Sequence, residues 1–177
     1  LELKDKDFLI LKKFSEKKKI KFLSTPFDEE SYQFLSNKLR CKNIKIPSGE
    51  INNFLMLKNV NLDNHKIFLS TGMATLTELA DFLNFISKSI IYESKKNKIV
   101  IKKRSRLKFL KKRVILMHCV TDYPVPDNFA NLSAIKTMKE TFELPVGYSD
   151  HTAGVIAPTI AVSFGAILIE KHLTYDQ

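Results

Sequence analysis

Two histidines near the end of the chain follow apolar runs, and each has hydroxyl and carboxyl side chains beside it. His151 comes just after the run 145–149, and His172 just after the run 166–171. Residues 152–164 have the length of one helix and Gly165 provides a turn, which predicts a βαβ unit with two parallel strands. Those strands would end at the same edge of a sheet and bring the two imidazoles together. Converging imidazoles suit a divalent metal such as Mn, Fe, Co or Zn, whereas a single histidine at a strand end is more often structural.

A second group of polar side chains could hold an anion. Lys45 lies in an otherwise apolar run, and Ser48, Ser70 and Ser149 end or follow three separate runs. One ammonium with several hydroxyls makes a pocket for a phosphate or carboxylate group. A lysine in an apolar strand is costly unless it is paired, so the alternative is that Lys45 faces solvent or pairs with Glu50. The serines could equally be turn formers.

Three further residues are candidates on less evidence. Glu50 follows a glycine, and we expect it near the metal as a general acid or base, with helix capping as its alternative role. Tyr123 lies in a Pro-rich loop, where it could donate a hydrogen bond to a substrate or only pack. His118 follows the apolar run 114–117, so we predict that it is a buried structural histidine.

Strands and helices alternate along the chain. The pattern predicts strands at residues 21–25, 43–47, 66–70, 114–119, 145–149 and 166–171. Helices are expected at residues 1–19, 28–39, 51–60, 75–90, 132–142 and 152–164. Polar residues cluster just after each strand, which is where a (β/α) barrel carries its active site. We therefore predict an α/β protein, a partial (β/α)8 TIM barrel with about six of the eight strands in one domain over residues 1–177.

Composition limits the class of protein. With 177 residues, 44% of them hydrophobic, the chain can bury a core as a single domain. Its two cysteines lie far apart and outside any metal-binding spacing, which favours a reducing, cytoplasmic setting. We see no signal peptide, and a start at Leu1 hints at a fragment. The uncharged stretch 152–169 contains Pro158 and Gly165 and is barely long enough for a membrane span, so we expect no membrane partner.

The formal net charge of +10 comes from one segment. Residues 95–113 hold eleven Lys and Arg and no acidic residue, which leaves 18 basic against 19 acidic residues elsewhere. We predict a solvated, Lys-rich loop with a helical turn. The alternative is a module that binds nucleic acid or another anionic surface, but Phe109 is the lone aromatic residue among the basic ones, so base stacking is weakly supported.

Seven short motifs, taken together, carry a resemblance to a known family. They are FLSTPFD (22–28), KIPSGE (45–50), LSTGM (69–73), HC (118–119), YP (123–124), GYSDHT (147–152) and EKH (170–172). In this order they resemble the N-acetylneuraminate (sialic acid) synthase family, including the legionaminate synthases. The likeness covers nearly the whole chain except residues 91–112.

The resemblance implies a condensation of phosphoenolpyruvate with an N-acylated hexosamine of the N-acetylmannosamine type. The products would be a nine-carbon, sialic-acid-like 2-keto sugar acid and phosphate, made in a (β/α)8 barrel with Mn²⁺ or Mg²⁺. By resemblance, the metal ligands are His151 and His172, and the catalytic candidates are Glu50 and Tyr123. The substrate-binding candidates are Lys45, Ser48, Ser70, Ser149, Thr25 and Thr121.

The chain also departs from the family's pattern. From the resemblance, we expect these 177 residues to lack the family's first two strands, with another catalytic glutamate and a phosphate-binding lysine, and its C-terminal antifreeze-like domain. Thr121 stands where some members have Asn or Ser. We expect a homodimer for the complete protein. The 177 residues alone are expected to be poorly stable, self-associating or catalytically inactive, because an incomplete barrel leaves sheet edges open.

Overall fold

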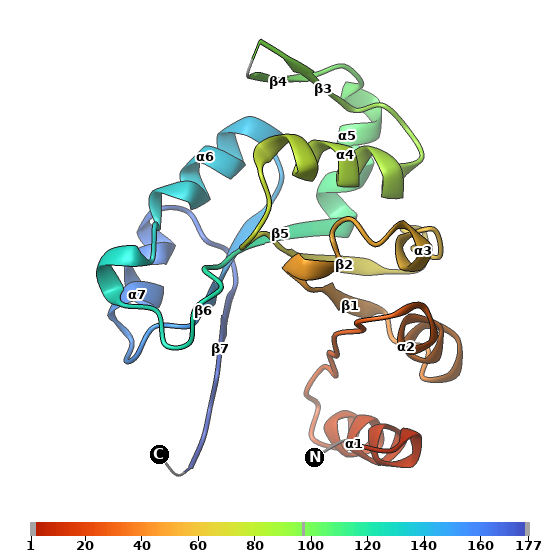
Figure 1. Cartoon of the computed structure of the whole chain (residues 1–177). Coiled ribbons are helices and arrows are strands. Elements are labelled where there is room, and N and C mark those ends of the chain that lie inside the picture. The colour runs from red at the N-terminus through yellow and green to blue at the C-terminus, as the bar shows by residue number, and fades with distance from the viewer. Residues whose placement is uncertain (1–2, 97, 176–177) are drawn as a thin grey trace.

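The computed structural model describes residues 3–96 and 98–175, and its main feature is a sheet of five parallel strands (Figure 1). In spatial order the strands are β1 (Asn43–Ile46), β2 (Lys66–Ser70), β5 (Val114–His118), β6 (Val146–Asp150) and β7 (Ile169–Lys171). Every neighbouring pair is parallel, so all five strands end at the same edge. Every residue of the central strands β5 and β6 is buried, as in a parallel sheet that is covered on both faces.

Helices connect the strands, as the sequence predicts. They are α1 (Asp5–Lys17), α2 (Glu29–Gln33) with a π-helical extension (Phe34–Lys38), α3 (Phe54–Leu57), α4 (Leu76–Ser87), α6 (Ser133–Phe142) and α7 (Ile156–Ser163). Two helix starts have side-chain caps: the Asp28 carboxylate accepts from Ser31 N at 2.7 Å, and Thr75 forms a capping box with Glu78. These caps satisfy backbone donors that would otherwise be unpaired at the first turn.

One predicted strand is absent. Residues 21–25 form no strand, and the backbone bond that joins them to the sheet runs from Lys45 N to Ser24 O at 3.3 Å. A strand needs a ladder of such bonds, and a contact of this kind at the outer edge of β1 does not provide one. The sheet in the described part of the chain therefore has five strands, where six were expected.

The basic segment is not the predicted loop. It contributes most of an antiparallel hairpin, β3 (Tyr92–Lys95) with β4 (Lys98–Ile101), and the helix α5 (Arg104–Arg113). Buried side chains anchor this unit, namely Tyr92, Leu107 and Leu110. Some of its charge is neutralised, because Lys95 and Lys102 pair with Glu93, and Arg104 and Lys111 pair with Glu143. This pairing reduces the positive charge that is available to bind a nucleic acid.

Two further observations concern the described residues only. Among them, no helix has both the length and the apolar character that crossing a membrane requires. Cys41 and Cys119 are both buried free thiols, and burial raises the pKa of each.

Candidate active site

A pocket of about 190 Å³ lies at the carboxyl edge of the sheet. Its walls come from the ends of β1, β6 and β7 and from the loop after β5. The lining residues are Lys45, Tyr123, Ser149, Asp150, His151, Glu170, Lys171 and His172. Five of them are candidates from the sequence, and all five come together although they are up to 127 positions apart, from Lys45 to His172.

The two histidines face each other across this pocket. Their ring centroids are 5.9 Å apart, and the Tyr123 ring lies 4.1 Å from the His151 ring and 5.9 Å from the His172 ring. His151 Nδ1 lies 2.7 Å from the carbonyl oxygen of Val120. A carbonyl only accepts hydrogen bonds, so Nδ1 carries the proton and Nε2 keeps the lone pair that a metal would take. Nε2 faces the Ser149 hydroxyl at 3.5 Å.

These residues fit a metal only in part. Two imidazoles supply two nitrogen ligands, but within residues 3–96 and 98–175 no group of three His, Cys, Asp or Glu side chains is placed to hold an ion. Any further ligands would be water or oxygen atoms of a substrate. Imidazole nitrogen suits Mn²⁺ better than Mg²⁺, which prefers an all-oxygen shell.

Lys45 pairs with a carboxylate, but not with the one that the sequence suggested. Its Nζ donates to both oxygens of Glu170, at 2.8 and 2.7 Å. Glu50 instead accepts from Asn53 Nδ2 at 2.6 Å. Strands β1 and β7 are the two edges of a five-stranded sheet, and four strand spacings would separate them by about 19 Å if the sheet were flat. The contact between Lys45 and Glu170 therefore requires the sheet to curve strongly, as in part of a barrel.

A buried carboxylate lies directly before His151. Oδ1 of Asp150 accepts from the backbone N and the hydroxyl of Thr152, at 2.9 and 2.8 Å, and Oδ2 accepts from Lys171 Nζ. Burial on its own would raise the pKa of Asp150, but the hydrogen bonds from Lys171 and Thr152 outweigh it and hold that pKa below its usual value. Asp150 is thus an ionised group inside the protein.

Five other candidates lie outside this pocket. Ser48 begins the 3-10 turn that ends at Glu50, and Ser70 is buried at the end of β2. Thr25 lines a different hollow, beside α2. Thr121 is exposed, with its hydroxyl oxygen 2.7 Å from where a β-carbon on Gly72 would stand. Their roles stay predictions that rest on the resemblance.

Three pocket residues were not singled out from the sequence: Asp150, Glu170 and Lys171. Each is a charged residue at the end of a strand-like run, one or two positions before a candidate histidine. The signal that could have found them is the one used for Lys45, because a charge in such a run needs a partner.

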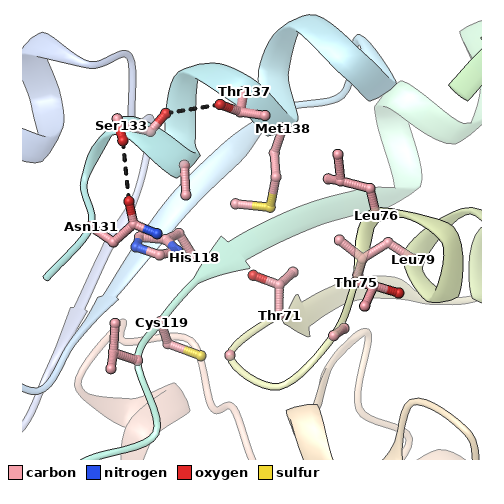
Figure 2. Close-up of a pocket in the computed structure, with 14 residues that line it drawn as sticks. Thr71, Thr75, Leu76, Leu79, His118, Cys119, Asn131, Ser133, Thr137 and Met138 are labelled. Carbon is pink, nitrogen blue, oxygen red and sulfur yellow. Dashed lines mark hydrogen bonds between the residues drawn. The ribbon is translucent and has the colours of Figure 1, made fainter. Parts of the chain in front are cut away.

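A larger hollow of about 450 Å³ opens between α4 and α6 (Figure 2). No charged residue lines it, and some of its polar groups bond to one another: Ser133 donates to Asn131, and Thr137 donates to the Ser133 backbone. His118 borders it with Nε2 2.9 Å from Ala130 O, and burial lowers its pKa. This confirms His118 as a buried histidine with a structural bond. The hollow lacks the charges of the carboxyl-edge pocket.

Comparison with known proteins identifies the family of the chain. The model of the NeuB family matches residues 1–177, which is the entire chain. The chain belongs to the NeuB family. An N,N'-diacetyllegionaminic acid synthase of Campylobacter jejuni is 45% identical over 177 residues, which are 100% of this chain and 47% of that protein. This NeuB chain spans about half the length of the curated relatives it matches.

Solved structures resemble the same fold. An N-acetylneuraminic acid synthetase from Leptospira borgpetersenii, in complex with citrate, superposes with a TM-score of 0.79 and 36% identity, over 99% of this chain and 54% of that one. A truncated 3-deoxy-D-arabino-heptulosonate 7-phosphate synthase from Thermotoga maritima superposes with a TM-score of 0.69, over 97% of this chain and 61% of that one. Its identity is 17%, so this similarity shows the fold alone. The five-stranded sheet of this NeuB chain is therefore part of a TIM-type barrel.

Proposed function

We propose that this chain forms part of the barrel of a synthase that condenses phosphoenolpyruvate with an N-acylated hexosamine. The products would be a nine-carbon, sialic-acid-like 2-keto sugar acid and phosphate. The observation that carries the proposal is the pocket in which a lysine, a serine, a tyrosine and two histidines converge at the carboxyl ends of the strands. Membership of the NeuB family supports the same reaction class.

Each group in the pocket has a chemical task under this proposal. Lys45 would hold an anionic group of phosphoenolpyruvate, and Ser149 would donate a hydrogen bond to it. Tyr123 contacts both imidazoles and, as in the sequence-based hypothesis, would donate a hydrogen bond to a substrate. His151 and His172 would hold Mn²⁺, or less readily Mg²⁺, which when bound supplies a Lewis acid for the sugar aldehyde.

The remaining assignments come from the resemblance. Glu50 is proposed as a catalytic carboxylate, and Ser48, Ser70, Thr25 and Thr121 as groups near phosphoenolpyruvate. A homodimer is proposed for the complete protein. In the described part of the chain, none of these five residues lines the pocket.

The test is release of phosphate from phosphoenolpyruvate by the protein at its natural length, with Mn²⁺ and a panel of N-acylated hexosamines. We expect release only when a suitable sugar is present, and a fall of at least about 100-fold in Lys45→Ala, in the range found when electrostatic groups are removed from active sites. Lys136→Ala is the matched control, because Lys136 is an exposed lysine on α6 with Glu140 as its ion partner. Absence of sugar-dependent release with every sugar, or equal losses in the two variants, would reject the proposal.

A further inference from the structure

We propose that Asp150 and Lys171 act as a pair of positioning residues that hold His151 and His172 at the separation a shared ligand needs. The inference rests on the proposed function for the role of the two histidines. The pair itself is a feature of the strands that carry them.

The pair joins β6 to β7 immediately before the two histidines. In the ladder between these strands Ser149 lies opposite Glu170, and Asp150 lies opposite Lys171. The ladder ends there, so the next residues on the two strands, His151 and His172, have no backbone pairing between them in that register. The Asp150–Lys171 ion pair thus links the last paired residues of the two strands, directly before the two histidines.

Packing does little to hold β7 in place. None of its three residues is buried, and it is an edge strand of the described sheet. The two residues just before β7 are hydrogen-bonded to β6, from Tyr148 N to Leu168 O and from Ile167 N to Val146 O, both at 2.8 Å. Those bonds lie just before β7, and the pairing of β7 with β6 continues to Lys171. Lys171 is the last residue of that pairing, directly before His172.

The ion pair also holds the backbone around His151. Asp150 accepts from Thr152 N at 2.9 Å, and Lys171 Nζ donates to Thr152 O at 2.8 Å. Asp150 directly precedes His151, and Thr152, which directly follows it, is bound by both members of the pair. Lys171 directly precedes His172. The Asp150 side chain is 0% exposed. Removing its cation would leave an uncompensated charge inside the protein, which is strongly destabilising. The pair thus restrains the chain beside both histidines, in addition to the bond from Val125 N to His151 O at 2.9 Å.

The experiment compares Asp150→Asn and Lys171→Met with the wild-type protein at its natural length. Asp150→Asn is the milder variant, because an amide oxygen can still accept from Thr152. Two readouts are needed: proton Overhauser contacts between the selectively labelled His151 and His172 rings, and the Mn²⁺ dissociation constant from calorimetry. We expect both variants to lose the ring contact and to bind Mn²⁺ about 10–100-fold more weakly, the usual effect of removing an outer partner of a metal ligand. Lys171→Arg, which keeps the charge, should recover much of that loss.

The control is Tyr92→Phe. It removes a buried hydrogen bond, 2.8 Å long, from Tyr92 Oη to Phe142 O, and neither residue lines the pocket. It should lower the melting temperature and leave both readouts unchanged, which separates positioning from general destabilisation. The proposal is overturned if Asp150→Asn keeps the ring contact and the wild-type Mn²⁺ affinity, or if Tyr92→Phe loses them equally. Failure of the wild type to bind Mn²⁺ would count against the proposed function, while the ring contact would still decide the positioning claim.

Discussion

Glu170→Gln should make the pocket bind anions more tightly. In the free protein the Lys45 ammonium is already occupied by the Glu170 carboxylate, at 2.7 Å. A phosphate or carboxylate that binds to Lys45 must displace this partner or lie beside a like charge. Glutamine keeps the size of the side chain and removes the negative charge, so the competition disappears.

The magnitude follows from the exposure of the pair. The Lys45 side chain is 16% exposed and that of Glu170 is 37% exposed, so the pair is neither fully buried nor free in solvent. Exposed pairs contribute about 0.2–1 kcal/mol, and breaking a buried pair costs about 3–5 kcal/mol. We take about 1–2 kcal/mol for this pair, which is a factor of about 5–30 in an equilibrium constant.

The assay is titration of the protein with phosphoenolpyruvate by calorimetry, without sugar, so that binding is measured apart from turnover. Glu140→Gln is the matched control, because it removes the same charge from an exposed position on α6. Glu170→Gln should bind phosphoenolpyruvate about 5–30-fold more tightly, as estimated above, with Glu140→Gln close to the wild type. Unchanged or weaker binding in Glu170→Gln would show that Glu170 does not compete for Lys45.

Two further predictions concern stability. Gly147→Ala should lower the free energy of unfolding by about 1–3 kcal/mol in urea titrations. A β-carbon there would lie 2.7 Å from Met117 Sδ and 2.9 Å from Leu168 O, a carbonyl in the backbone pairing of β6. A urea midpoint equal to that of the wild type would contradict this packing. Burial, with Lys42 nearby, lowers the pKa of His65, so the folded protein binds its proton less readily than the unfolded chain. The stability from neutral His65 is complete above its ordinary pKa of about 6.5 and declines as the pH falls through the lowered value. His65→Gln should therefore weaken the dependence of the urea midpoint on pH between about 7.5 and 5.5, whereas an unaltered dependence would assign it to other groups such as His118.

Local signals in the sequence predicted most of the sheet. The strand β2 has the predicted bounds, and helices begin next to the predicted starts at residues 28 and 75. The convergence of His151 and His172 also followed from the chain, because a βαβ unit has a fixed geometry. These features depend on residues that are close in sequence or on a connection with a known hand.

The features that the sequence missed depend on contacts between separate elements of the fold. The partner of Lys45 is 125 positions away, and the contact arises from the curvature of the sheet, which no local pattern encodes. The basic segment was predicted as a loop because of its lysines, although Ile99 and Ile101 alternate with outward-facing residues and pack against the core. Residues 21–25 have the composition of a strand, but the described chain provides no ladder for them.

The measurement that tests the central claim most directly is a Mn²⁺ titration by calorimetry, with and without phosphoenolpyruvate, of the natural-length protein and its His151→Ala/His172→Ala variant. His65→Gln serves as the control, since His65 bonds Tyr32 and Ser36 away from the pocket. The account predicts one Mn²⁺ site that disappears in the double variant, persists in the control and becomes tighter with phosphoenolpyruvate. Mn²⁺ binding that survives the loss of both histidines would contradict it.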